Sequence, residues 1–214
     1  YHDRTPLHYA VLSNNEDVFN WLIRNGAAKN LQDKSYVPAL HIAALKGNVK
    51  MMRNLLNGLN IEAKDWQGNT PLHLAAESGN AKAVKELLDF SAQINAKRNV
   101  DEATPLYIAA INGHDSVVSL LIERKANVNA ARATDLATPL HAAAHDSEIK
   151  VVKLLIDAKS NLTLENSQGE TPIFTAIRYG SAETVQLLLD SGSSKEHRSN
   201  SGATPLIIAA ITGH

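Results

Sequence analysis

The chain has 214 residues, with 21 Lys and Arg against 22 Asp and Glu, so its formal net charge is −1. This balance leaves no basic stripe for nucleic acid, and no apolar run is long enough to span a membrane. Cysteine is absent, which excludes a disulfide framework and thiol chemistry. We therefore expect no nucleic-acid partner and no direct membrane insertion by this segment.

A short motif recurs along the whole chain, and its clearest copy is Thr-Pro-Leu-His-Leu-Ala-Ala at residues 70–76. Further copies begin at Thr5, Thr104, Thr138, Thr171 and Thr204, and a degenerate copy occupies residues 38–44. Measured at the third position of the motif, successive copies lie 33, 32, 34, 34, 33 and 33 residues apart. A fixed period in this range indicates stacked repeats that each pack mainly against their neighbours.

Each residue type in the motif has a local physical role. Thr is expected at the N-cap, where its hydroxyl can accept a backbone N–H that the helix leaves unpaired. Pro follows at the first helical position, where its missing N–H costs nothing. A Gly near the end of this helix, as at Gly79 and Gly113, supplies a left-handed C-cap. The Leu and the Ala pair then form a face that packs on the neighbouring repeat.

A second helix follows in each of the first six repeats, with apolar residues at i, i+3 and i+4 spacing. Val84, Leu87 and Leu88 are an example. Trp21 aligns with leucines of later repeats at 120, 154 and 187. We therefore predict that Trp21 packs in the core.

The motif, its period and its extent resemble the ankyrin-repeat family. The resemblance implies an all-α solenoid, in which each repeat has a β-turn finger followed by two antiparallel helices. It implies a single array over residues 1–214, with repeats starting near 1, 33, 65, 99, 133, 166 and 199 and the last one truncated. A second helix should cover Ile207, Ile208 and Ile211, so we interpret the chain as an interior piece of a longer array.

The sequence departs from the family pattern at two kinds of turn. The family usually closes the second helix with Gly, whereas this chain has Ser91, Lys125 and Lys159 there. Each departure costs up to about 1 kcal/mol if the backbone stays left-handed. The fingers near residues 33–37, 99–103 and 133–137 also lack the Gly that residues 65–69 contain. Because repeats four and five have 34 residues, we predict atypical, longer fingers there.

Four histidines occupy the same motif position, namely His8, His41, His73 and His141. The resemblance implies that they form hydrogen bonds between neighbouring repeats. His141 and His145 have the i, i+4 spacing of a metal site, but no third ligand is evident, so we favour the structural role.

The sequence contains no Gly-rich phosphate loop and no nucleophile elbow. We therefore expect no enzymatic activity, no metal, no cofactor and no small-molecule substrate. The expected partner is another protein. Family resemblance favours a cytoplasmic location, and secretion remains an open alternative.

The resemblance implies that partners bind the concave surface formed by the fingers and the exposed face of the first helices. Aromatic residues and Arg dominate interface hot spots, so Trp66 is the leading candidate, followed by Tyr179 and Arg178. The predicted partner-binding residues are Tyr1, Arg4, Leu12, Lys34, Val37, Leu45, Trp66, Asn69, Glu77, Ile111, His145, Arg178 and Tyr179.

The leading functional hypothesis is thus a non-catalytic protein–protein interaction module. One alternative is a structural array that packs within its own larger parent protein, such as a channel, a toxin or a scaffold. A second alternative is a targeting domain fused to an enzyme. The sequence does not name the partner, since one repeat fold binds unrelated targets.

Overall fold

The computed structural model describes residues 4–146, 148–179 and 181–213. The chain forms two compact units, Tyr1–Val100 and Asp101–His214. Across the described residues there are thirteen helices and no strand, apart from an isolated antiparallel bridge between Gln32 and Pro38. The all-α fold class is therefore confirmed.

The first unit contains three pairs of helices. We call the helix that begins at the motif the first helix of its repeat, and the one after it the second helix. First helices α1, α3 and α5 pack on one another in order, and each packs on the second helix that follows it. The bounds of the six helices in this unit are α1 Pro6–Leu12, α2 Glu16–Arg24, α3 Ala39–Lys46, α4 Val49–Leu56, α5 Pro71–Glu77 and α6 Ala81–Asp89.

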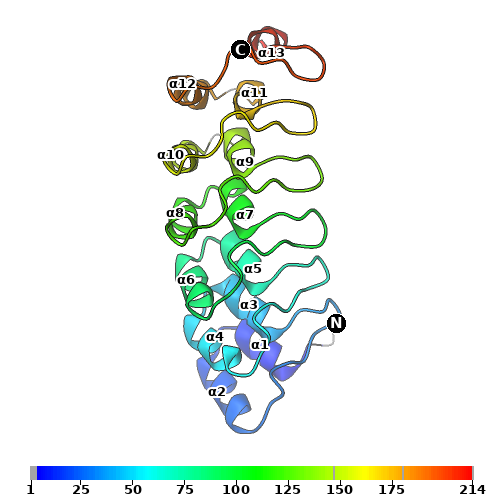
Figure 1. Ribbon diagram of the computed structural model, residues 1–214. Coiled ribbons are helices and arrows are strands. Elements are labelled where there is room, and N and C mark those ends of the chain that lie inside the picture. The colour runs from blue at the N-terminus through cyan, green and yellow to red at the C-terminus, as the bar shows by residue number, and fades with distance from the viewer. Residues whose placement is uncertain (1–3, 147, 180, 214) are drawn as a thin grey trace. The chain divides into compact units, whose positions relative to one another are not determined.

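The second unit repeats this arrangement and ends with a single first helix. Helices α7, α9, α11 and α13 pack in succession, and α8, α10 and α12 form a second row. Within each unit the finger loops extend from the first-helix row, away from the second-helix row (Figure 1). The bounds are α7 Pro105–Ile111, α8 Asp115–Glu123, α9 Pro139–His145, α10 Ile149–Asp157, α11 Pro172–Arg178, α12 Ala182–Asp190 and α13 Pro205–Thr212.

The motif begins the first helices as expected. Thr is the N-cap and Pro the first helical residue of α1, α5, α7, α9, α11 and α13. The hydroxyl of Thr104 accepts the backbone N–H of Tyr107 at 3.3 Å, and that of Thr138 accepts the N–H of His141 at 3.4 Å. These caps pair backbone donors that a helix start otherwise leaves unsatisfied.

The core of each unit is built from the motif leucines and the small residues beside them. Leu72, Leu106 and Leu140 are each 1% exposed, and the Ala pairs of these helices are fully buried. Burying a leucine contributes about 1.5–3 kcal/mol, and Ala lets neighbouring helices approach closely. In α13 the pattern changes: Ile208 is buried, whereas Leu206 and Ile211 are 77% and 75% exposed.

Trp21 does not pack in the core as predicted, because 62% of it is exposed. Phe19 is the buried residue of α2, and Asn54, one repeat later, is exposed like Trp21. Leu120, Leu154 and Leu187 at the same position are only partly buried. The position lies at the edge of the apolar stripe of the second helix, so sequence alignment alone overestimated its burial.

The turns that close the second helices keep the left-handed backbone without Gly. Ser91, Lys125 and Lys159 have φ of +67°, +68° and +63°, close to +78° at Gly26. A side chain in this conformation is strained by contact with its own backbone. The left-handed backbone, on which the predicted cost of up to about 1 kcal/mol per position depends, is therefore present at all three positions.

The fingers without Gly also retain a left-handed residue. Leu136 has φ of +58°, where the finger of repeat six has Gly169 at +69°. In repeat six, Asn166 and Glu170 close the finger, whereas in repeat five the equivalent hydrogen bond joins Arg132 N–H to Ala137 C=O. The finger of repeat five is therefore one residue longer, which confirms the prediction for that repeat.

Replacing either left-handed lysine by glycine should stabilise the chain. We expect Lys125→Gly and Lys159→Gly each to raise the free energy of unfolding by about 0.5–1 kcal/mol, because Gly adopts this conformation without strain. The matched control is Lys153→Gly, at an exposed position inside α10, which should lower it by about 1 kcal/mol. Urea unfolding measures all three changes. Destabilisation by Lys125→Gly would contradict the strain argument.

Candidate functional site

One histidine in each of several repeats ties its helix start to the next finger. The Nδ1 atom of His141 accepts the backbone N–H of Thr138 at 3.2 Å, and its Nε2 lies 3.0 Å from the carbonyl oxygen of Glu170. In the first unit, His8 makes the same pair of bonds, to Thr5 at 3.1 Å and to Val37 at 3.0 Å. The inter-repeat role implied by the resemblance is thus confirmed for these positions.

His41 keeps only half of this arrangement. Its Nε2 lies 3.0 Å from the carbonyl oxygen of Asn69, but its buried Nδ1 has no hydrogen-bond partner. The N-cap here is Pro38, which has neither a backbone N–H nor a hydroxyl. The degenerate motif in repeat two therefore has a direct structural consequence.

Burial keeps these histidines neutral. It lowers the pKa of His141, His41 and His8 below the usual value of 6.5, although each backbone carbonyl contact raises it. With Nδ1 of His8 and His141 accepting a backbone N–H, the ring proton belongs on Nε2, which then donates to the finger carbonyl.

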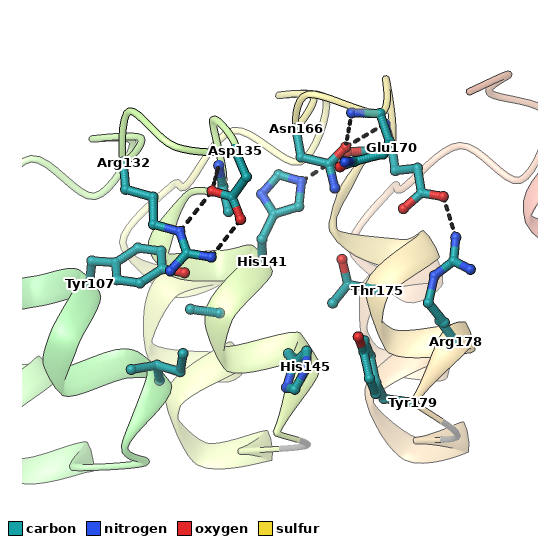
Figure 2. Close-up of a pocket in the computed structure, with 14 residues that line it drawn as sticks. Tyr107, Arg132, Asp135, His141, His145, Asn166, Glu170, Thr175, Arg178 and Tyr179 are labelled. Atoms are coloured by element: carbon teal, nitrogen blue, oxygen red, sulfur yellow. Dashed lines mark hydrogen bonds and ion pairs between the residues drawn. The ribbon is translucent and has the colours of Figure 1, made fainter. Parts of the chain in front are cut away.

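In the second unit, α7, α9, α11 and the fingers above α9 and α11 enclose a hollow of about 460 Å³. We call it the α7–α11 groove (Figure 2). Its lining residues are Tyr107, Ile111, Arg132, Asp135, Ala137, His141, Ala142, His145, Asn166, Gln168, Glu170, Thr175, Arg178 and Tyr179.

Arg132 forms one upper corner of the groove. Its Nε and Nη2 donate to the two carboxylate oxygens of Asp135 at 2.7 and 2.5 Å, and its guanidinium lies 5.0 Å from the centre of the Tyr107 ring. Asp135 also accepts the backbone N–H of Ala137 at 3.0 Å. The bond from Arg132 holds the pKa of Asp135 below its usual value, so the pair remains ionised at neutral pH.

A second Arg–carboxylate pair stands on the opposite wall. Arg178 on α11 donates through Nη2 to Glu170 of the finger above it. That finger is braced by Asn166, whose side-chain oxygen accepts the backbone N–H groups of Gln168 and Glu170 at 2.9 and 3.0 Å. Glu170 itself is buried, whereas the Arg178 side chain is 40% exposed.

Two aromatic rings lie at the base of the groove. The rings of His145 and Tyr179 have their centroids 3.7 Å apart at an angle of 45°. His145 also contacts Asp146 through Nδ1 at 2.8 Å, and Tyr179 is 50% exposed. The two side chains present a tilted aromatic surface between α9 and α11 (Figure 2).

Below the Arg132–Asp135 pair, the wall formed by α7 and α9 is apolar. Ala103, Tyr107, Ile108, Ala137 and Ala142 form a buried cluster, with Ile111 packed against it. The groove thus combines an apolar wall, exposed aromatic rings and a partly exposed arginine, which are the groups that dominate protein recognition.

The groove's histidines do not assemble a metal site in the part of the chain that the structure describes. No group of three or more His, Cys, Asp or Glu residues occurs there in metal-binding arrangement. Both ring nitrogens of His141 are already engaged, Nδ1 at the start of its own helix and Nε2 in the contact to the next repeat.

The groove brings together four of the residues predicted from sequence, namely Ile111, His145, Arg178 and Tyr179. In the first unit, Trp66 is 63% exposed and Leu45 40% exposed. Lys34 and Glu77 are also exposed, whereas Arg4, Leu12 and Val37 are partly buried. Tyr1 lies outside the described residues.

Asn69 departs from its predicted place on the surface. It is 2% exposed, and its side-chain amide donates to Asp65 at 3.1 Å, which braces the finger. This burial corrects the expectation that Asn69 is available to a partner.

Sequence reasoning did not single out Tyr107 or Arg132 as groove residues. The sequence signal that could have found them is that they depart from the repeat pattern. Tyr107 stands where four copies of the motif have His, and Arg132 precedes a finger that is one residue longer than that of repeat six. Their proximity depends on contacts between repeats, which no single repeat encodes.

Comparison with known proteins agrees with this architecture. A family model described as "Ankyrin repeats (3 copies)" matches residues 7–98, 92–166 and 140–214. The chain belongs to the ankyrin-repeat family. Ankyrin repeats are in general protein–protein interaction modules, and domains of this kind are typically non-catalytic.

Two solved ankyrin domains are similar over nearly the whole chain. The human ASB11 ankyrin repeat domain has 31% sequence identity and a TM-score of 0.88, covering 96% of this chain and 92% of that one. The ankyrin repeat domain of Bcl-3, described as a unique member of the IkappaB protein family, has 26% identity and a TM-score of 0.84. That match covers 98% of this chain and 95% of the Bcl-3 chain.

Among curated sequences, inversins match over shorter stretches. Human inversin is 38% identical over 90 residues, which is 42% of this chain, and chicken (Gallus gallus) inversin is 45% identical over 69 residues, or 32% of it. The matched stretches span only 8% and 6% of those proteins. In the described parts of this chain, no helix has the length and apolar character needed to cross a membrane.

Mild acid should destabilise the array through its buried histidines. Their pKa values are lower in the folded chain than the usual 6.5, so the unfolded chain binds more protons as pH falls through this value. Their stabilising contribution is therefore complete above about pH 7 and is lost progressively below pH 6.5. Urea midpoints at pH 7.5 and 5.5 measure the loss.

The control for this experiment is His141→Gln, which removes one of the titrating rings. We expect a smaller drop in unfolding free energy between pH 7.5 and 5.5 than in the wild type. An unchanged pH dependence in this variant would contradict the assignment of His141 as a neutral, buried donor.

Proposed function

We propose that the chain is a non-catalytic module that binds a partner protein through the surface made by its fingers and first helices. We assign the principal contact to the α7–α11 groove. The observation that carries this proposal is the gathering of Ile111, His145, Arg178 and Tyr179 around one hollow of about 460 Å³. Trp66, exposed on a finger of the first unit, is proposed as an additional contact.

The chemistry of the groove supports recognition rather than catalysis. Arg132 and Arg178 are each held by a carboxylate, so their orientation is fixed before a partner arrives. The exposed rings of His145 and Tyr179 provide contact area at little cost in conformational entropy. Such preorganised Tyr and Arg groups are typical of interface hot spots.

A structural role within a larger assembly is the second candidate. Leu206 and Ile211 on α13 are exposed, and Leu206 borders a hollow of about 880 Å³ between α13 and the helices α11 and α12. An apolar surface of this kind favours packing against further protein. The role of any whole protein containing this array, including membership of a channel, toxin or scaffold, stays a hypothesis.

A capture experiment tests the groove as the partner-binding surface. The full chain and a Tyr179→Ala/His145→Ala variant serve as baits in lysate of the source cell, with quantitative mass spectrometry. We expect a partner retained by the wild type to fall at least about tenfold with the variant, because loss of a hot-spot pair costs about 2 kcal/mol or more.

The matched control is Trp21→Ala, which removes an aromatic side chain at least as exposed as Tyr179 from α2, a second helix away from the fingers. Circular dichroism verifies that each bait is folded. Equal capture by wild type and groove variant, or loss with Trp21→Ala, would reject the groove and favour the structural role.

A further inference from the structure

The two walls of the α7–α11 groove differ in chemistry at equivalent repeat positions. On α7 the groove is lined by Ile111, while Ile108 is buried behind it; on α11 the equivalent positions hold Arg178 and Thr175, and both line the groove. Ile111 packs against the buried apolar cluster, whereas Arg178 is exposed. A ligand that fills the groove therefore meets the apolar side chain of Ile111, below the Arg132–Asp135 pair, at one end and polar side chains of α11 at the other.

The polar wall offers more hydrogen-bond donors than the chain itself uses. Thr175, Arg178 and Tyr179 follow i, i+3, i+4 spacing on and just after α11, so they share one face. Arg178 donates a hydrogen bond to Glu170 through Nη2, while its Nε and Nη1 have no partner within the described residues. The hydroxyls of Thr175 and Tyr179 also have no hydrogen-bond partner in that part of the chain.

The carboxylates near this wall are already engaged. Glu170 is buried beside Arg178, and both oxygens of Asp135 accept bonds from Arg132. Asp146 does not line the groove, and its carboxylate contacts the Nδ1 atom of His145. The accessible charge on the polar wall is therefore the guanidinium of Arg178, which favours a carboxylate through charge-assisted hydrogen bonds.

The distance between the walls limits how the two features are spaced on a ligand. Helices α7 and α11 both pack on α9, and packed helices lie about 8–10 Å apart, so the walls are separated by about 16–20 Å. An extended chain rises about 3.3 Å per residue, so it crosses this distance in about five or six residues.

We propose that the α7–α11 groove binds an extended peptide with an apolar side chain at α7 and a carboxylate side chain, about five or six residues away, at Arg178. This inference rests on the proposed function and specifies the chemistry of the partner. A polyanion such as nucleic acid is a poor match, because the α7 wall is apolar.

Two variants isolate Arg178 without leaving a buried charge unpaired. Glu170→Gln removes the internal competitor and frees the guanidinium. Glu170→Gln/Arg178→Gln then removes the guanidinium while an uncharged pair remains in place. Comparing these two variants separates ligand recognition from the cost of an orphaned buried carboxylate.

The experiment selects peptides from a phage-displayed random 12-residue library on the full chain. Selected sequences are then synthesised, and their dissociation constants are measured by fluorescence polarisation. We expect Asp or Glu to be enriched five or six residues from Leu, Ile, Val or Phe. Glu170→Gln should bind these peptides more tightly than wild type, and the double variant at least about tenfold more weakly than Glu170→Gln.

A change in the peptide completes the test. Replacing its acidic residue by Asn or Gln should weaken binding to the wild type and to Glu170→Gln, but have little effect on the double variant. Ile111→Ala should weaken binding through the apolar end, and Trp21→Ala should leave it unchanged.

The contradicting outcomes distinguish this inference from the proposed function. Peptides that lose binding with Tyr179→Ala but show no acidic preference would overturn the carboxylate assignment and leave the groove as a binding site. Peptides indifferent to Tyr179→Ala, or a selection that yields no binder, would overturn both.

Discussion

In repeats one and five, a single histidine with two hydrogen bonds of opposite sense joins the start of its helix to the next finger. In His141 the Nδ1 atom accepts from the N-cap Thr138, and Nε2 donates to the carbonyl of Glu170 in the next finger. One ring therefore links the start of its own helix to the following repeat. Burial favours the neutral form that this pattern requires, so local capping, inter-repeat packing and protonation are coupled.

The groove uses the positions around this link. Glu170, whose carbonyl receives the bond from His141, also directs its carboxylate to Arg178. In repeat four, Tyr107 replaces the histidine and instead lies beneath the guanidinium of Arg132. The extra residue of the repeat-five finger accompanies the Arg132–Asp135 pair at its base. The departures from the repeat pattern thus supply the chemistry of the groove, while the retained residues supply its geometry.

Much of the fold could be predicted from sequence because its determinants are local and periodic. The N-caps and the first-helix cores follow from residue type and position, and the left-handed turns at Lys125 and Lys159 follow from repeat position alone. The burial of residues at the edge of the core could not be predicted in this way. Trp21 is exposed because it lies at the edge of the apolar stripe of α2, and Asn69 is buried because its side chain braces a finger. The groove combines residues from three repeats, so no single repeat specifies it.

The most direct test of the account is the protonation pattern of the motif histidines, measured by two-dimensional ¹H–¹⁵N NMR of the imidazole rings. For His141 and His8 at neutral pH we predict a neutral ring with the proton on Nε2 and an unprotonated Nδ1, retained in Trp21→Ala. A ring protonated on Nδ1, or an imidazolium at neutral pH, would contradict the account, because Nδ1 could not then accept the N–H of the capping threonine.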